Sequence, residues 1–180
     1  MNKTKIFFTT YLIFIIISIV MIFSYILIFF PLKYKEEVLL ASNEYNLEPC
    51  LVASIINAES RFDKNATSHA GAMGLMQLLP STAKEIAIKL GLNDFVAEDL
   101  FKPEINIKFG CFYFSELYTR FRDLNTTICA YNAGPNKVQA WLKDKAYSST
   151  GKSLDSTPYS ETNKYLNKIL NSINIYRNYF

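Results

Sequence analysis

An uncharged and almost wholly apolar run from Ile6 to Phe30 is the strongest structural signal in the sequence. A helix of about 20 apolar residues crosses a bilayer, and this run is long enough to do so with some tilt. The apolar region of a cleaved signal peptide is shorter, roughly 7–15 residues, and leads to a small-residue cleavage site. Phe29-Phe30-Pro31-Leu32 is a poor cleavage site. We therefore predict an uncleaved signal-anchor over residues 6–30; the alternative, a helix buried in a protein core, is seldom this long.

Basic residues flank the apolar run on both sides, so charge alone barely decides its orientation. Lysines precede it within residues 1–5, and Lys33 and Lys35 follow it. Together with the amino terminus, the positive-inside rule leans towards an inner N-terminus and an outer domain. The expected organisation is a short cytoplasmic N-terminus (1–5), a transmembrane segment (6–30) and one domain of ordinary size (31–180) outside.

The composition of the remaining chain argues against several classes of protein. The chain has 19 Lys and Arg and 16 Asp and Glu, and setting aside the two lysines before the apolar run leaves 17 basic residues. The outer domain is thus close to neutral, without the basic stripe of a nucleic-acid-binding protein. His69 is the only histidine and no CxxC pair is present, so we expect no zinc site, other metal or cofactor. Cys50, Cys111 and Cys129 permit either one disulfide or three buried free thiols.

Helical periodicity governs the sequence after the apolar run, with no convincing period-two alternation and no internal repeat. Pro49 and Pro80 suit the first turns of helices, and Asn125 is expected to cap the helix that follows it. The polar segment 145–157 is expected to be an exposed loop. We predict an all-α domain, with helices over residues 32–46, 51–60, 80–90, 104–121, 126–133, 138–142 and 160–177.

Glu59 stands at the end of an apolar helical stripe. Val52, Ile55, Ile56 and Glu59 are spaced i, i+3, i+4 and i+7, so they share one face of a helix. Burial there disfavours the charged carboxylate and predicts a raised pKa. A carboxylic acid that is still protonated near neutral pH can act as a general acid. Spacing alone leaves open the alternative that Glu59 simply reaches solvent from the helix end.

Four short strings stand out from ordinary helical sequence: Glu59-Ser60, Gly74-Leu75-Met76-Gln77, Ala130-Tyr131-Asn132-Ala133-Gly134-Pro135, and Pro158-Tyr159-Ser160-Glu161-Thr162 followed by Tyr165. In this order and spacing they resemble the catalytic domain of the family 1 soluble-type lytic transglycosylases, which share a lysozyme-like α fold with goose-type lysozyme. The resemblance covers roughly residues 34–177. It implies a lysozyme-like transglycosylase domain, preceded here by one N-terminal transmembrane helix.

The resemblance also implies a role for each string. Glu59 is the implied catalytic acid/base, and Ser60 is similar to a motif serine near the N-acetyl or peptide side of the substrate. The resemblance implies three groups of substrate contacts. Gly74, Met76 and Gln77 belong to a loop that lines the cleft, and Tyr131 and Asn132 form a pair that faces the carboxyl group. Glu161 and Tyr165 belong to a motif that closes the sugar-binding groove.

Most of these residues also have a purely structural interpretation. Ser60 could cap its helix, Gly74 could serve the geometry of a turn, and Met76 could fill the core. Tyr131 could be a core aromatic residue, Asn132 could mark a helix end, and Glu161 could be a carboxylate in the first turn of a helix. Gln77 differs, because a polar side chain within an apolar string must find hydrogen-bond partners, which favours a place in a cleft.

The reaction that the resemblance implies is cleavage of the bond between N-acetylmuramic acid and N-acetylglucosamine in peptidoglycan glycan strands. Glu59 would protonate the glycosidic oxygen, and the muramic acid 6-hydroxyl would attack C1 to give a 1,6-anhydro product. A hydrolytic muramidase is the nearest alternative and would use a second acid, for which Asp63 is the residue to test. A non-catalytic glycan-binding module is a third. The catalytic domain would lie on the cell-wall side of the membrane. A role as an accessory factor of an envelope-spanning machine would be compatible with this enzymatic activity.

Overall fold

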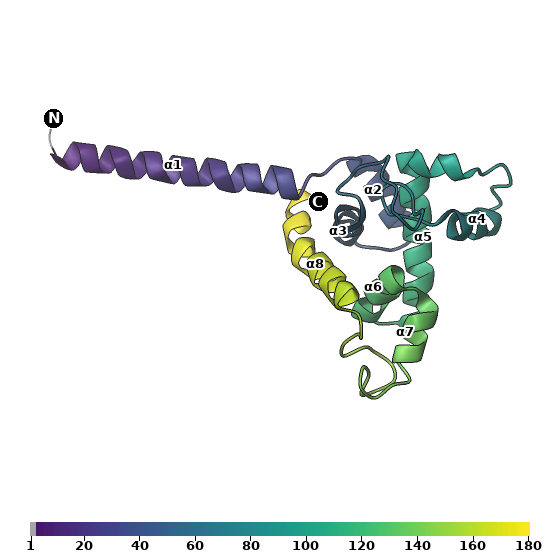
Figure 1. Cartoon of the computed structure of the whole chain (residues 1–180). Coiled ribbons are helices and arrows are strands. Elements are labelled where there is room, and N and C mark those ends of the chain that lie inside the picture. Colours follow the sequence, from purple (N-terminus) through teal and green to yellow (C-terminus); the bar gives the residue numbers. More distant parts are fainter. Residues whose placement is uncertain (1–2) are drawn as a thin grey trace. The chain divides into compact units, whose positions relative to one another are not determined.

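The computed structural model describes residues 3–180, and the chain divides into two units between Pro31 and Leu32. The first unit contains a single helix, α1 (Lys3–Phe29), drawn in purple in Figure 1. Its stretch Phe7–Ile26 is long and apolar enough to cross a membrane. The length and composition of this stretch fit the predicted membrane span.

The second unit is built from helices, which confirms the all-α fold class. They are α2 (Lys35–Glu44), α3 (Pro49–Glu59), α4 (Pro80–Lys89), the 3-10 helix η1 (Ala97–Phe101), α5 (Pro103–Phe121), α6 (Leu124–Ala133), α7 (Pro135–Trp141), α8 (Ser160–Tyr176) and the 3-10 helix η2 (Arg177–Tyr179). Within the described residues, β-structure is limited to two isolated antiparallel bridges in the segment between α3 and α4.

Four of these helices begin at a proline. Pro49, Pro80, Pro103 and Pro135 open α3, α4, α5 and α7. A proline fits a first turn because its fixed φ suits a helix and its missing N–H would have no partner there. The helix starts expected at Pro49 and Pro80 are therefore confirmed.

The N-cap of α6 differs from the sequence prediction. Asp123 has extended backbone angles (φ −137°, ψ 128°), and its carboxylate accepts the backbone N–H of Thr126 at 2.8 Å. Asn125 already lies inside α6, so the expectation that it caps this helix is wrong. Both residue types can cap, and the cap is the one that is the last extended residue before the helix.

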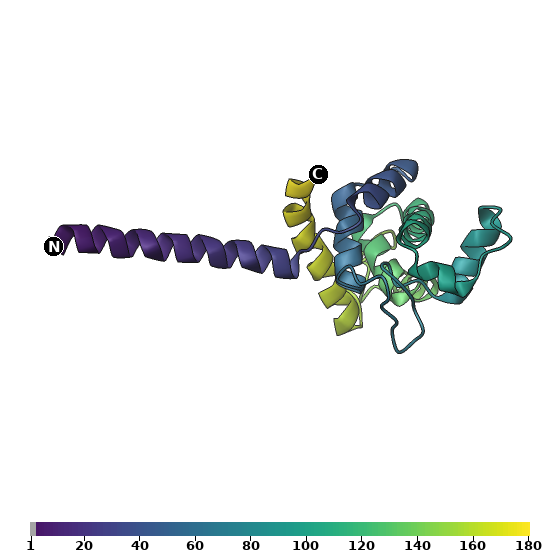
Figure 2. The same ribbon diagram turned by 90° about the horizontal axis from the view of Figure 1, so that it is seen from above.

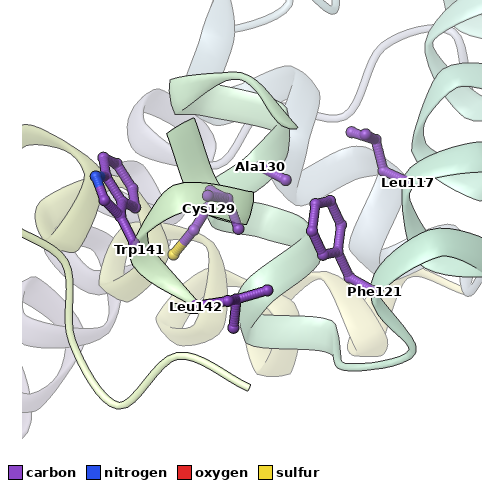
Figure 3. Packing of buried hydrophobic residues seen from close by; sticks show 7 residues of the cluster. Leu117, Phe121, Cys129, Ala130, Trp141 and Leu142 are labelled. Atoms are coloured by element: carbon purple, nitrogen blue, oxygen red, sulfur yellow. The ribbon is translucent and has the colours of Figure 1, made fainter. Parts of the chain in front are cut away.

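Helix α3 lies at the centre of the second unit, and its residues Cys50–Asn57 are all buried. Helices α2 and α8 pack against it, and α8 lies next to it in both views (Figures 1 and 2). A second core region joins α5, α6 and α7, as Figure 3 shows. It consists of Leu117, Phe121, Cys129, Ala130, Val138, Trp141 and Leu142. Of the candidate site residues, Glu59 lies at the end of α3, and Tyr131 and Asn132 lie in α6.

The segment after α7 is irregular and mostly exposed, as expected, but it is fixed at several points. The side chains of Ser148 and Thr157 are buried. Leu154 packs against the second core region, and its backbone N–H donates to the Thr126 hydroxyl at 3.0 Å. Short side-chain-to-backbone hydrogen bonds therefore replace regular secondary structure in this segment.

All three cysteines are buried and free, which decides between the two alternatives that the sequence left open. Cys50 lies in the first turn of α3, Cys111 in α5 and Cys129 in α6. The second unit is therefore held together by packing and hydrogen bonds without a covalent cross-link among its cysteines.

Candidate active site

Glu59 is the last residue of α3, and its carboxyl group faces α8 in a partly buried position. The Tyr165 hydroxyl donates to Glu59 Oε1 at 2.6 Å. Burial raises the pKa of Glu59 to about 7, while the hydrogen bond from Tyr165 and the charge of Lys168 act in the opposite direction. The apolar stripe predicted this direction of shift. A carboxyl group with this pKa is substantially protonated at neutral pH and can donate a proton.

The loop between α3 and α4 is folded tightly at Gly74. Gly74 has φ +76°, and a Cβ atom there would lie 2.1 Å from the Leu100 carbonyl oxygen and 2.2 Å from Asn106 Nδ2. Its N–H donates to the carbonyl of Ala66 at 2.9 Å. Only glycine combines this backbone angle with such close neighbours, so Gly74 acts through the shape of the loop.

Asn106 holds the same loop from helix α5, and its contribution was not foreseen from the sequence. Its side chain is fully buried. It accepts from the N–H of Met76 at 2.7 Å and donates to the carbonyls of Met73 and Leu100 at 2.9 and 2.8 Å. The available signal was the place of Asn106 on the same helix face as the buried Phe109 and Gly110, because a buried amide must find partners.

Met76 and Tyr131 are joined through the backbone. The side chain of Met76 is fully buried, which supports its interpretation as core filling. Its carbonyl oxygen accepts a hydrogen bond from the Tyr131 hydroxyl at 2.8 Å. Burial holds the pKa of Tyr131 well above its ordinary range, so the hydroxyl stays protonated and donates. The ring of Tyr131 lies 5.5 Å from that of Tyr113, measured between centroids.

Gln77 and Ser60 fasten the loop to its neighbours. Gln77 has φ +50°, and its amide nitrogen donates to the carbonyls of Ala66 and Gly74 at 3.1 and 2.8 Å. The Ser60 hydroxyl donates to the carbonyl of Leu75 at 2.8 Å and, less closely, to that of Ile56 at 3.2 Å. Ser60 therefore ties the end of α3 to the loop, in accord with the structural interpretation of this residue.

The start of α8 is connected to α6 beside the same region. The Thr162 hydroxyl donates to Asn132 Oδ1 at 2.9 Å. Glu161, the preceding residue, is exposed in the first turn of α8. Together with the hydrogen bond from Tyr165 to Glu59, this contact brings the two C-terminal strings beside the end of α3.

These elements enclose a cleft with a volume of about 550 Å³. Five of the predicted site residues line it, namely Glu59, Gln77, Tyr131, Asn132 and Glu161. The other four support it from behind through the contacts given above, namely Ser60, Gly74, Met76 and Tyr165. His69 and Tyr113 also line the cleft, although the sequence suggested no site role for either.

Acidic groups are sparse in this cleft. Of the residues described as lining it, only Glu59 and Glu161 are acidic. Asp63 is exposed, is not among those lining residues, and accepts the N–H of Asn65 at 2.9 Å within its own turn. The arrangement offers one partly buried proton donor in a cleft lined by tyrosine rings and amide groups, which suits general acid catalysis.

Known proteins are similar to this chain in sequence and in fold. Residues 38–153 match the family model described as the transglycosylase SLT domain. A transglycosylase of Enterobacteria phage PRD1 is 37% identical over 116 residues, which cover 64% of this chain and 40% of the phage protein. The membrane-bound lytic murein transglycosylase C of Edwardsiella ictaluri is 31% identical over 167 residues, covering 81% of this chain and 46% of that protein.

A solved structure leads to the same family. The lytic transglycosylase Slt from Pseudomonas aeruginosa superposes with a TM-score of 0.75 and 32% sequence identity, covering 84% of this chain and 25% of that protein. The chain thus spans less than half the length of each of these three proteins. Because the family model covers well over half of the sequence and includes the strings around Glu59, Gly74 and Tyr131, the chain belongs to the transglycosylase SLT domain family.

Proposed function

We propose that this chain is a membrane-anchored lytic transglycosylase that cleaves peptidoglycan between N-acetylmuramic acid and N-acetylglucosamine. The observation that carries the proposal is the Glu59 carboxyl group, which lines the cleft with a pKa of about 7 and accepts a hydrogen bond from Tyr165. The name of the Edwardsiella ictaluri relative supports the substrate, since that protein is a lytic murein transglycosylase.

The first step is proton donation from Glu59 to the glycosidic oxygen. As the bond to the leaving sugar breaks, positive charge develops at C1 of the muramic acid residue, and the acetamido group of the substrate stabilises it. Glu59 is left as a carboxylate. The Tyr165 hydroxyl and the positive charge of Lys168 stabilise this charged form, since both lower the pKa of Glu59.

The second step uses the same carboxylate as a base. Glu59 takes the proton of the muramic acid 6-hydroxyl while that oxygen attacks C1, so a 1,6-anhydro ring forms and Glu59 regains its proton. One carboxyl group therefore serves both steps, in contrast to the two-carboxylate arrangement of most glycosidases. The exposed position of Asp63 outside the cleft lining supports this single-carboxyl scheme over a role for Asp63 as the second acid.

Hydrolysis of the same bond by water is the alternative outcome, and Glu161 is the acidic residue in the cleft that such a muramidase would use.

The roles of the remaining cleft residues are binding ones. Gln77, Tyr131 and Asn132 present amide and phenol groups to the sugars, while Gly74 and Met76 give the loop its shape.

The anchor in this proposal is helix α1, with residues 6–30 as a single uncleaved span and the second unit on the cell-wall side. The length and apolar character of Phe7–Ile26 support it, as does a relative that is named as membrane-bound. This location would place the cleft next to its substrate and within reach of proteins that build envelope structures.

Mass spectrometry of the products released from purified peptidoglycan tests the proposal. The detergent-solubilised full chain is compared with Glu59→Gln, which keeps the hydrogen-bonding shape of the side chain without its acidity. Fragments ending in 1,6-anhydromuramic acid, absent with the variant, are the expected result. Fragments with a reducing muramic acid end, which are one water heavier, would identify a muramidase. Glu161→Gln would then show whether Glu161 is its second acid. Equal release by both chains would refute the role of Glu59.

A further inference from the structure

Helix α8 contacts the end of α3 at two neighbouring points. Tyr165 donates to Glu59 Oε1 at 2.6 Å. Lys168 follows three positions later on the same helix, and its ammonium group donates to the carbonyl oxygen of Ala58 at 2.8 Å. A longer contact of 3.5 Å joins Lys168 Nζ to the carbonyl oxygen of Asn57. Residues three apart lie on one side of a helix, so one face of α8 holds both the carboxyl group and the backbone immediately before it.

The end of a helix needs such contacts, because its last four carbonyl groups lack partners within the helix. In α3 the Ile56 carbonyl accepts from the backbone N–H and the hydroxyl of Ser60. Lys168 supplies the donor for the carbonyl of Ala58. These carbonyls also carry the partial negative charge of the helix C-terminus, which disfavours a carboxylate at the same place. A positive group at this end therefore favours the charged form of Glu59.

Resting on the function proposed above, we propose that Lys168 is a positioning residue for the general acid: it fixes the last turn of α3 and stabilises the carboxylate that Glu59 becomes after donating its proton. Nothing in the sequence motifs points to this lysine. Its side chain is exposed and does not line the cleft, so it acts through Glu59 and without touching the substrate.

Several charged and titratable groups surround this pair. Tyr165 faces Glu59 from α8, and the proximity of the Glu59 charge contributes to the raised pKa of Tyr131 on α6. The part of the Lys168 side chain that packs against α3 is partly desolvated, which lowers the pKa of Lys168, and Arg61, in the turn after α3, acts in the same direction. Tyrosine hydroxyls stay neutral across the working pH range, so Lys168 and Arg61 are the cations of this region whose removal would change the charge balance.

The test is the titration of the Glu59 side-chain carboxyl by ¹³C NMR, together with the pH profile of kcat/KM, in the full chain in detergent. Lys168→Met removes the charge and keeps an extended apolar side chain. We expect the Glu59 titration, and with it the basic limb of the profile, to move to higher pH by about half a unit. Lys168→Arg keeps the charge and should restore the wild-type midpoint.

Lys164→Met is the matched control, because Lys164 is an exposed lysine of the same helix. It should leave the Glu59 midpoint unchanged. If Lys168→Met titrates like this control, or if Lys168→Arg shifts as far as Lys168→Met, the inference about Lys168 is wrong. A wild-type chain that releases no product would instead contradict the proposed function, and the NMR midpoint would still decide the role of Lys168.

Discussion

Glu59 combines its position in the site with a cost to stability. Its pKa is about 7 in the folded chain, against about 4.5 for an ordinary glutamate. Because the pKa of Glu59 is higher in the folded chain than in the unfolded chain, Glu59 lowers the stability of the fold only at pH values where the unfolded chain has lost the Glu59 proton. The penalty is thus absent below about pH 4.5 and grows until about pH 7, above which it is fully present.

Glu59→Gln should therefore stabilise the second unit more at high pH than at low pH. Between pH 5 and pH 8 we expect the gain in free energy of unfolding, relative to the wild type, to increase by about 2 kcal/mol. Urea unfolding followed by the fluorescence of Trp141, the only tryptophan, would measure it. A gain that is the same at both pH values would show that Glu59 has an ordinary pKa.

Gly74 allows a second prediction at the scale of single residues. Gly74→Ala would place a methyl group against the Leu100 carbonyl and Asn106 at positive φ, and we expect a loss of more than about 3 kcal/mol in unfolding free energy. Gly91→Ala is the control, since Gly91 has φ +71° with no atom within 4 Å of the added Cβ. That variant should lose only about 1 kcal/mol. Similar losses at both positions would mean that backbone angle alone explains Gly74.

At the scale of elements, the cap of α6 can be tested directly. Asp123→Ala removes the acceptor of the Thr126 N–H and should lower the free energy of unfolding by about 1 kcal/mol. Asn125→Ala, which changes an exposed residue inside the helix, should change it by less than about 0.5 kcal/mol. Thermal unfolding of both variants checks this, and the reverse order would restore Asn125 as the cap.

The helices themselves were largely predictable, because proline starts and apolar periodicity are local properties of the sequence. The cap of α6 was not, since Asp123 and Asn125 both have capping side chains and only the backbone angles separate them. Asn106 and Lys168 were missed for a different reason. Their partners lie at Met73 and Ala58, far away along the chain, and no periodic pattern reports such contacts.

For the site, the family resemblance was confirmed and brought the right segments together. Local pattern had indicated the raised pKa of Glu59 and the need of Gln77 for partners. It could not tell which residues line the cleft and which support it. That distinction depends on the side toward which each side chain turns once α3, α6 and α8 are packed, and it separates Tyr131 from Met76 although one hydrogen bond joins them.

At the scale of the whole molecule, the proposed anchor predicts how the chain partitions. If residues 6–30 span the bilayer, washing membranes with alkaline carbonate should leave the full chain in the pellet, because this treatment releases proteins held only by surface contacts. The segment 32–180 expressed without α1 is the control and should be recovered in the supernatant. Recovery of the full chain in the supernatant would contradict a spanning helix.

The three buried free thiols have a consequence for how this domain can be monitored. Burial raises the pKa of Cys129 to about 11 and raises those of Cys50 and Cys111 as well. A thiol reacts with alkylating reagents through its thiolate, so all three should be inert while the fold is closed. Because they lie in α3, α5 and α6, their separate rates of alkylation form a built-in record of which helix opens first.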